Sequence, residues 1–488
     1  MRILLTGATG FVGQSLARQL ILDGHELVVL SRHPQKVART LGVPCQAFAW
    51  QATDTLPPKE AFQGVDGVIN MMGESLASGR WTSERKTRIY DSRVLGTRHL
   101  VHAIDRYCEK ALQFFMSFSA IGYYPDHAST TWNEDSPTGS GFLAEVCRDW
   151  EAEAKKLKQT ERTIILRLGT VLGYHGGALQ KLLPIFKLGV GGPIGQGQQW
   201  MSWIHIDDLV KLVTTAVTNR AYIDVINAVA PEPVTNRVFS QVIARILHRP
   251  VMMSVPAPVM KLAMGEMSQI VLDSQRIVSR KLSELGFRFL YANIDHALAE
   301  ACGFVPVGLK GEKIVCDRIE SWQFLPQPIE EVFEFFCNPY NLQKITPPML
   351  NFAIQGNPDQ PLKEGSQINY RLKVHGFPMR WKTLITEWEA NSCFIDFQLS
   401  GPYKIWHHQH RFYPIQGGTL MMDRVDYRLP FGYFGYLFGH ALVQRDVNQI
   451  FRFRFDNIEG ELTNYIDLQK KVKNIRQHPS VTWSALSS

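Results

Sequence analysis

Short apolar runs alternate with amphipathic helical stretches over the first part of the chain. Apolar runs of strand length cover residues 3–5, 27–30, 65–71 and 112–118, and a long amphipathic stretch covers residues 82–106. Strands that alternate with helices predict a parallel sheet with helices on both faces. Sheets of this kind bind ligands beyond the carboxyl ends of their strands. We therefore expect the chemistry of this half at the turns that lead from strand to helix.

The hydrophobic pattern changes twice further along the chain. Residues 251–303 are rich in Met and in small helical segments, and they predict a helical appendage that closes the first domain. After about residue 310 a short helix at 329–336, a long helix at about 435–456 and long strands are expected, the strands at 314–322, 367–374, 379–388, 393–399, 404–413 and 419–429. This order predicts an antiparallel α+β domain. The expected domains are a doubly wound Rossmann domain over 1–250, a small helical subdomain over 251–310 and an α+β domain over 311–488.

A glycine-rich turn follows the first strand and opens the first helix. It reads Gly7-Ala8-Thr9-Gly10-Phe11-Val12-Gly13. Gly7 permits the tight turn, Gly10 lets the backbone approach a pyrophosphate, and Gly13 allows close packing of helix on strand. The start of the helix then offers free N–H groups and a partial positive charge to phosphates. The pattern predicts a dinucleotide site that includes Gly7, Thr9, Gly10, Phe11, Val12 and Gly13.

The end of the second strand bears on the choice of cofactor. It reads Leu30-Ser31-Arg32-His33 and lacks the Asp or Glu that usually holds the ribose 2′-hydroxyl of NAD. Arg32 can pair with a 2′-phosphate instead, which favours NADP(H) over NAD(H). The alternative is that Arg32 is a solvated loop residue.

Net charge, cysteine spacing and the length of the apolar runs exclude some classes of protein. The 488 residues carry a formal net charge of +7, with Lys and Arg scattered along the chain, so we expect no nucleic-acid partner. The seven cysteines form no CxxC pair, which predicts reduced thiols and a cytoplasmic protein. The chain starts directly with a strand and has no apolar run of about 20 residues, so neither a signal peptide nor a transmembrane segment is expected. The oligomeric state cannot be read from the sequence.

Several motifs together resemble those of extended short-chain dehydrogenases. Besides the glycine turn, they are Asn70-Met71-Met72-Gly73-Glu74, Ser117-Phe118-Ser119-Ala120, Arg167-Leu168-Gly169 and Trp203-Ile204-His205-Ile206-Asp207-Asp208. The sequence is most similar to an atypical branch, the NAD(P)-dependent epimerase-like family with its short C-terminal helical domain. The resemblance covers residues 1 to about 303. It implies that Asn70, Gly73, Ser117 and Leu168 join the cofactor site, and that Ser119 takes the place of the family's catalytic serine.

The chain departs from the wider superfamily at the expected catalytic pair. Those dehydrogenases use a Tyr followed four residues later by a Lys, which lowers the tyrosine pKa. The corresponding helix here reads Phe142-Leu143-Ala144-Glu145-Val146, with neither residue in place. Ser119 and Tyr123 remain as catalytic candidates, with Tyr123 either a proton donor or a packing aromatic at a turn.

Other polar residues near strand ends have more than one interpretation. Glu74 follows a strand and faces either the nicotinamide region or solvent. His205 is followed by Asp207 and Asp208, one of which we expect to be the N-cap of the next helix.

The region from about 314 to 475 resembles the START-like (SRPBCC) superfamily in the order of its elements and in Asn338-Pro339-Tyr340-Asn341-Leu342. The resemblance implies a helix-grip fold with an apolar cavity for a hydrophobic ligand; an ordinary filled core is the alternative. Aromatic residues in or just before the predicted long helix fit such a cavity, namely Phe431, Tyr433, Phe434, Tyr436 and Phe438. His408 and His410 share one strand face, but no third ligand stands at metal spacing, so no metal is expected.

Three functions stay open at this point. The first is an NADP(H)-dependent oxidoreductase or epimerase-like enzyme on an unknown small-molecule substrate, with an appended domain for a hydrophobic ligand. The second is an NADP(H)-binding regulatory or scaffold protein without catalysis; the missing Tyr and Lys favour it, whereas the retained Ser119 and the pocket motifs favour the first function. The third is a carrier of an apolar ligand whose first domain senses redox state.

Overall fold

The computed structural model describes residues 1–251, 254–307, 311–359 and 361–477. The chain divides into two compact units, Met1–Val305 and Pro306–Ser488, and each is described by itself. No helix in the described part of the chain combines the length and the apolar character needed to cross a bilayer.

The first unit contains a seven-stranded sheet in the order β11-β7-β5-β4-β1-β2-β3, and every neighbouring pair in it is parallel. The strands are β1 Arg2–Thr6, β2 Glu26–Ser31, β3 Gln46–Ala49, β4 Gly67–Asn70, β5 Phe114–Ala120, β7 Thr163–Leu168 and β11 Asp224–Ala228. The chain reverses its direction of travel across the sheet between β1 and β4. The crevice at such a reversal is where open α/β sheets bind ligands.

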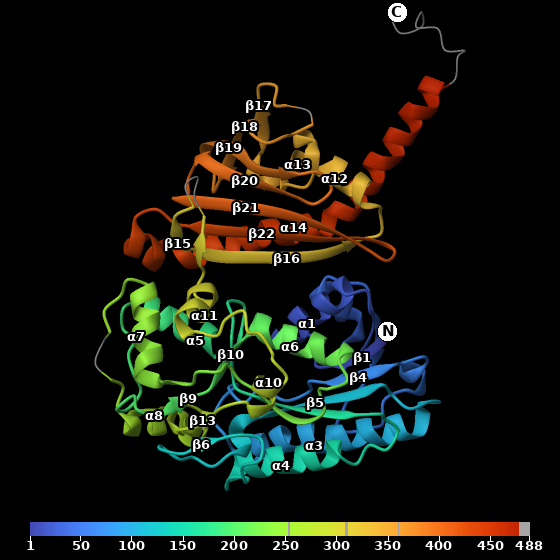
Figure 1. Ribbon diagram of the computed structural model, residues 1–488. Helices are drawn as coiled ribbons and strands as arrows, with labels where there is room; N and C mark the ends of the chain where they lie inside the picture. Colours follow the sequence, from blue (N-terminus) through green and yellow to red (C-terminus); the bar gives the residue numbers. More distant parts are fainter. Residues whose placement is uncertain (252–253, 308–310, 360, 478–488) are drawn as a thin grey trace, which may run out of the picture. The chain divides into compact units, whose positions relative to one another are not determined.

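Helices cover both faces of this sheet. Figure 1 shows α1 and α6 on one face and α3 and α4 on the other. The helices are α1 Phe11–Leu22, α2 Val37–Leu41, α3 Ser83–Tyr107, α4 Phe142–Ala154, α5 Gly177–Lys187, α6 Ile206–Thr218 and α7 Asn236–Ile246. Short strands form separate two-stranded sheets, namely β6 Thr131–Trp132, β8 Thr170–Leu172, β9 Trp200–Met201, β10 Trp203–His205 and β12 Val234–Thr235, with β6 paired to the later β13 (Arg276–Ile277). The expected doubly wound Rossmann-like domain is thereby confirmed.

Small elements follow α7 within the first unit. They are α8 Ala257–Met264, α9 Gln269–Leu272, β13 Arg276–Ile277, α10 Arg280–Glu284 and α11 Ile294–Ala301, and β14 Phe304–Pro306 lies at the unit boundary. They are joined to the Rossmann part by side chains at the start of α6. Asp208 is fully buried and accepts hydrogen bonds from the backbone N–H groups of Leu290 (2.6 Å) and Tyr291 (2.9 Å). His205 lies 3.1 Å from a carboxylate oxygen of Glu300.

The second unit is an antiparallel sheet with helices. Its seven strands have the order β16-β22-β21-β20-β19-β18-β17. The elements are β15 Lys313–Val315, β16 Asp317–Leu325, α12 Ile329–Cys337, α13 Pro339–Lys344, β17 Ala353–Gln355, β18 Gln367–Val374, β19 Phe377–Glu389, β20 Cys393–Ser400, β21 Ile405–Ile415, β22 Gly418–Arg428 and α14 Gly432–Gln477. The predicted antiparallel sheet is confirmed.

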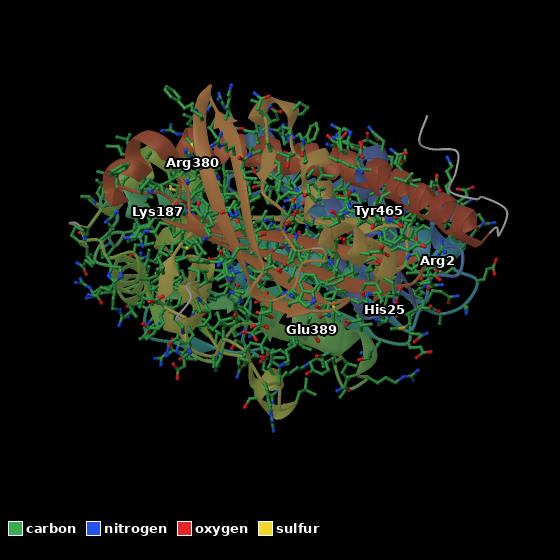
Figure 2. All side chains as sticks on the ribbon, turned by 90° about the horizontal axis from the view of Figure 1, so that it is seen from above. Arg2, His25, Lys187, Arg380, Glu389 and Tyr465 are labelled. Carbon is green, nitrogen blue, oxygen red and sulfur yellow. The ribbon has the colours of Figure 1, made fainter. Side chains whose placement is uncertain are left out.

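The last helix is longer than its predicted range of 435–456. Its apolar stripe continues through the buried residues Ile458, Leu462 and Tyr465, which pack with α12 and the inner face of the sheet. Tyr465, labelled in Figure 2, donates a hydrogen bond of 3.1 Å to Glu334 of α12. The helix continues as far as this packing supports it and for a few turns beyond.

Candidate functional site

The glycine turn lies at the reversal point of the first sheet. Gly7 has φ +67°, a conformation that favours glycine, and an added Cβ would lie 2.6 Å from the carbonyl oxygen of Met71. Gly13 is equally confined, since a Cβ there would lie 2.5 Å from the carbonyl oxygens of Gly7 and Ala8. These two glycines therefore serve the packing of the turn itself against β4 and α1.

Gly10 has a different role in the same turn. It is exposed, its φ is −76°, and it precedes α1 with no side-chain cap. The N–H groups of the first helical turn, which starts at Phe11 and Val12, have no partner within the helix. Thr9 is exposed beside them, and its carbonyl oxygen accepts a hydrogen bond from Gln14. The turn thus presents free backbone donors and a helix N-terminus at the sheet edge.

Phe11 joins this turn to a second glycine-rich segment. A Cβ on Gly176 would lie 2.4 Å from the ring of Phe11, and a Cβ on Gly173 would lie 2.8 Å from it. The segment before α5 can therefore pack against the ring of Phe11 only because positions 173 and 176 are glycines. The role of Phe11 in the structure is to hold these two loops together.

Arg32 follows the end of β2 and is exposed. Its guanidinium has no hydrogen-bond or ion-pair partner among the residues that the structure describes. The side chain is thus available to a ligand at the end of β2, although the same observation fits a solvated residue.

Asn70 and Ser117 are engaged beneath the turn. Asn70 is fully buried; its side-chain oxygen accepts a hydrogen bond of 2.8 Å from Thr6, and its amide donates to Thr97 (2.9 Å) and Ser117 (3.3 Å). Thr6 in turn accepts a hydrogen bond of 3.1 Å from the backbone N–H of Met71. These side chains connect the ends of β1 and β4 and the middle of β5 to α3. They support the site from below, and their side-chain polar atoms are already paired.

Gly73 and Glu74 continue the loop after β4. Gly73 is exposed, and a Cβ there would lie 2.9 Å from the guanidinium of Arg93, which donates to the carbonyl oxygen of Glu74 at 3.0 Å. The Glu74 carboxylate is paired with the buried Arg85 at 2.7 Å. Glu74 is therefore neither a free surface carboxylate nor a free base.

Ser119 lies at the end of β5 and contacts a buried ion pair. Its hydroxyl, in a side chain that is 2% exposed, donates to the Glu151 carboxylate at 2.7 Å. Glu151, on α4, receives two further hydrogen bonds from Arg167 of β7, at 2.8 Å from Nε and 2.8 Å from Nη2. Despite burial, this carboxylate raises the pKa of Arg167, so the guanidinium stays charged. The pair occupies the end of the sheet next to Ser119.

Tyr123 and Tyr124 both pack against the Arg167 guanidinium. The Arg167 guanidinium is 3.4 Å from the ring centroid of Tyr123, a close cation–π contact. Tyr124 is the buried member: it accepts a hydrogen bond from Arg167 at 2.9 Å and donates one to Asn227 at 2.7 Å, and burial raises its pKa to about 12. The hydroxyl of the half-buried Tyr123 has no hydrogen-bond partner among the described residues. Leu168 ends β7 half-buried, directly after Arg167.

The sequence analysis missed Glu151 and Arg167 as a pair. The signal for Glu151 was present, because it shares one helix face with the buried Ala144, Cys147 and Ala154 at spacings of three and four residues. A charged residue on the apolar face of a helix needs a buried partner. The N-cap prediction for Asp207 or Asp208 was wrong, since His205 is the N-cap of α6 and accepts the Asp207 N–H at 3.3 Å.

The second unit encloses a cavity of about 170 Å³ between its sheet and helices. Its aromatic lining includes Tyr370, Trp381 and Trp406 from the sheet and Phe335, Phe336 and Phe451 from the helices. Of the aromatic residues expected at the start of the last helix, Phe431 is 84% exposed and Tyr436 is not among the described lining residues. The side chains of Tyr433, Phe434 and Phe438 lie outside the described residues.

A charged cluster forms one wall of this cavity. His408 and His410 of β21 lie beside Asp396 of β20, and Arg454 of α14 completes the wall. Asp423 of β22 lies behind them, paired with His408 and 3.4 Å from the Arg454 guanidinium. The expected absence of a third group near the histidines was wrong, because Asp396 comes from the neighbouring strand.

Electrostatics separate the two histidines. Although burial acts against it, the Asp423 and Asp396 carboxylates raise the pKa of His408 to about 9. Burial and the adjacent His408 charge lower the pKa of His410 to about 4. The pKa values of both carboxyls lie below their usual range because His408 and, for Asp423, Arg454 outweigh burial.

Two family models match the first unit. The NAD dependent epimerase/dehydratase family matches residues 3–229, and a domain of unknown function (DUF1731) matches residues 255–301. The glycine turn, the reversal point and the Glu151–Arg167 pair all fall within the first match. The second match covers the small helical elements after α7.

Individual proteins show the same similarity. The chain is 38% identical over 300 residues to the chloroplastic epimerase family protein SDR39U1 homolog of Arabidopsis thaliana, covering 61% of this chain and 86% of that protein. It is 35% identical over 302 residues to the epimerase family protein YfhF of Bacillus subtilis (strain 168), covering 62% of this chain and 97% of that one. A crystal structure of human epimerase family protein SDR39U1 (isoform 2) with NADPH matches with a TM-score of 0.55 and 31% identity, over 62% of this chain and 99% of that one.

Proposed function

Because the chain belongs to the NAD dependent epimerase/dehydratase family, we propose that its first unit is an NADP(H)-dependent oxidoreductase or epimerase-like enzyme acting on a small-molecule substrate. The observation that carries the proposal is the glycine turn at the reversal point between β1 and β4. Gly10 leaves the start of α1 uncovered, and backbone N–H groups at a helix N-terminus suit a pyrophosphate. The residues present therefore fit a dinucleotide.

We assign the cofactor contacts to residues around this turn. Gly7, Thr9, Gly10, Phe11, Val12 and Gly13 form the turn, and Gly73 and Leu168 lie at neighbouring strand ends. Asn70 and Ser117 support the site from beneath, since their side chains bond to each other and to Thr6 and Thr97. When bound, NADPH supplies the hydride for carbonyl reduction.

Arg32 is the basis for preferring NADP(H). It is exposed at the end of β2, where a 2′-phosphate is recognised in this fold. The similar human structure contains NADPH, which supports the same cofactor here. Isothermal titration of the full chain tests the choice: NADPH binds more tightly than NADH, and Arg32→Ala weakens NADPH binding alone. Lys36→Ala, at an exposed cation one turn further, is the matched control. Equal affinity for both cofactors contradicts the proposal.

Ser119 and Tyr123 are the proposed catalytic residues. The Ser119 proton is committed to Glu151, whereas the Tyr123 ring is fixed on Arg167 and its hydroxyl is unengaged. Tyr123 is therefore the better proton donor, and Ser119 a hydrogen-bond partner that depends on Glu151. A donor without a neighbouring Lys suits carbonyl reduction better than alcohol oxidation. A screen of carbonyl compounds with NADPH, followed by Ser119→Ala and Tyr123→Phe on any active substrate, tests these roles.

A second candidate function is NADP(H)-dependent regulation without turnover. The observation that favours it is the start of α4, where Phe142 and Val146 stand in place of the Tyr and Lys of the wider superfamily. Tight NADPH binding, combined with the absence of NADPH oxidation in the presence of any carbonyl compound, would favour this function. The same unit would then sense the redox state of the cofactor pool.

We propose further that the second unit has a START-like helix-grip fold and binds a hydrophobic ligand. The cavity beneath the sheet supports this, since Leu372, Tyr370 and Trp381 present apolar surface to it. Displacement of a fluorescent fatty acid from the full chain tests the proposal. Leu372→Trp, which fills the cavity, abolishes probe binding, whereas Phe377→Trp, at a residue that is 71% exposed, leaves it unchanged. Unchanged probe binding by Leu372→Trp contradicts it.

The compartment is proposed to be the cytoplasm. All seven cysteines are free thiols, as reducing conditions favour.

A further inference from the structure

We propose that Asp396, His408 and His410 bind a divalent transition-metal ion of the zinc class in the wall of the second unit's cavity. This site is independent of the function assigned to the first unit. The three side chains come from two adjacent strands and form a set of two imidazoles and one carboxylate. Zinc uses donor sets of this kind in sites that keep one position open.

The distances between the donor atoms suit a single ion. Asp396 Oδ2 lies 3.1 Å from His408 Nδ1 and 3.3 Å from His410 Nε2. In a tetrahedral site with bonds of about 2.0–2.1 Å, neighbouring donor atoms are about 3.3 Å apart. The donor atoms of all three residues lie within 4.8 Å of one another. A small movement of the imidazoles completes the arrangement.

The sheet fixes these positions through its pairing. His408 and His410 are two residues apart on β21 and therefore point to the same face. Asp396 of β20 stands opposite His408 in the antiparallel ladder, which brings the carboxylate alongside the histidine pair. His407, between them, points to the opposite face. The convergence is thus a property of strand register and needs no flexible loop.

A second carboxylate stands where it can orient the two histidines. Asp423 Oδ1 is hydrogen-bonded to His408 Nε2 and lies 3.3 Å from His410 Nδ1, the nitrogens turned away from Asp396. Metal-binding histidines usually donate their other N–H to such a carboxylate. His410 is 4% exposed, and its Nδ1 has no hydrogen-bond partner of good geometry among the described residues. The side chains around this buried imidazole therefore do not satisfy both of its ring nitrogens.

The open coordination position faces the cavity. Asp396, His408 and His410 all line it, together with apolar residues such as Phe394 and Phe451, whereas Asp423 does not. The fourth position would take water or one donor group of a mainly apolar ligand. Two imidazole nitrogens disfavour Mg²⁺ and Ca²⁺, which prefer oxygen donors, so the site selects a transition metal.

The experiment is a metal titration of the full chain after treatment with a chelator. One sample is titrated with Co²⁺, which can replace Zn²⁺ and reports the coordination geometry by its visible absorption. A second sample is loaded with Zn²⁺ and dialysed exhaustively, and the Zn²⁺ that stays bound is measured by mass spectrometry. We expect one ion per chain and the intense visible bands of tetrahedral Co²⁺. Absence of these bands, or absence of retained Zn²⁺, overturns the proposal and leaves an imidazolium held between two carboxylates.

Variants localise the ion. His410→Ala and Asp396→Asn abolish the Co²⁺ bands, whereas His407→Ala, on the opposite face of the same strand, preserves them. Asp423→Asn keeps all three ligands and weakens Zn²⁺ affinity by about 10–100-fold, as is typical for loss of an orienting partner. Circular dichroism checks that each variant is folded. Bands that persist in folded His410→Ala, or vanish in His407→Ala, place the ion elsewhere and refute the assignment.

Discussion

Replacing Glu151 by Leu would leave the Arg167 guanidinium without its partner at the end of the sheet. The two side chains are 4% and 3% exposed, so solvent screens the pair very little. Each hydrogen bond to a charged group contributes about 1.5–3 kcal/mol, and the two from Arg167 alone contribute about 3–6 kcal/mol. Breaking a buried pair by removal of one partner costs about 3–5 kcal/mol. We therefore expect Glu151→Leu to lower the free energy of unfolding of the first unit by about 3–5 kcal/mol.

The assay must measure the stability of the first unit alone, because the chain consists of two compact units. Hydrogen exchange of the full chain in increasing urea, followed on peptides from β5 and β7, reports the free energy of opening of that sheet. Glu161→Leu is the control. Glu161 is 45% exposed and its partner Arg220 is 78% exposed, so this ion pair contributes only about 0–1 kcal/mol to stability.

The double variant separates charge from packing. Combining Glu151→Leu with Arg167→Met removes both charges and recovers most of the loss, because the cost arises from the unpaired guanidinium. A loss below about 1 kcal/mol in Glu151→Leu, or a double variant as unstable as the single one, would refute the reasoning.

Three further predictions concern other parts of the first unit. Gly10→Val abolishes NADPH binding, as measured by calorimetry, because the branched side chain covers the start of α1. The fold is retained, as circular dichroism checks, because a Cβ at this position meets only the Gly7 carbonyl oxygen, at 3.3 Å. Tyr123→Phe lowers the turnover of any carbonyl substrate by about 10²–10³, as loss of one donor to a developing oxyanion does, and unchanged turnover removes Tyr123 from the mechanism. Burial and the Asp126 carboxylate raise the pKa of Asp273 to about 6, so its contribution to the stability of the first unit is lost as pH rises from about 4 to about 6. Asp273→Asn then raises the melting temperature at pH 7 but not at pH 4, and an equal effect at both values contradicts this cause.

Local apolar patterns in the sequence predicted β1, β2, β4 and β5 of the first sheet and every strand of the second sheet except β17, whereas β3, β7 and β11 of the first sheet were not predicted. The strand at 367–374 matches β18 residue for residue, and the long helix at 82–106 matches α3 within one residue at each end. The end of the last helix was missed because tertiary packing with α12 extends it beyond the predicted range.

The candidate sites divide in the same way. The glycine turn is a contiguous motif and was visible in the sequence. The Glu151–Arg167 pair and the Asp396–His408–His410 cluster depend on which faces of separate elements meet. For Asp396 the deciding fact is the pairing of β20 with β21, which a single sequence does not specify. For Glu151 it is the contact of α4 with the end of β7.

The hydrogen bonds of Asn70 affect the entropy change of binding for any ligand that contacts the glycine turn. Its side chain joins Thr6, Thr97 and Ser117, so the ends of β1 and β4 are fixed relative to each other, to β5 and to α3 in the folded protein. Ordering a free segment costs about 1–2 kcal/mol of conformational entropy per residue. The strand ends incur no such cost on association, because folding has already immobilised them. The entropy change measured for a ligand at this edge would therefore report the ligand's own loss of motion and the release of water.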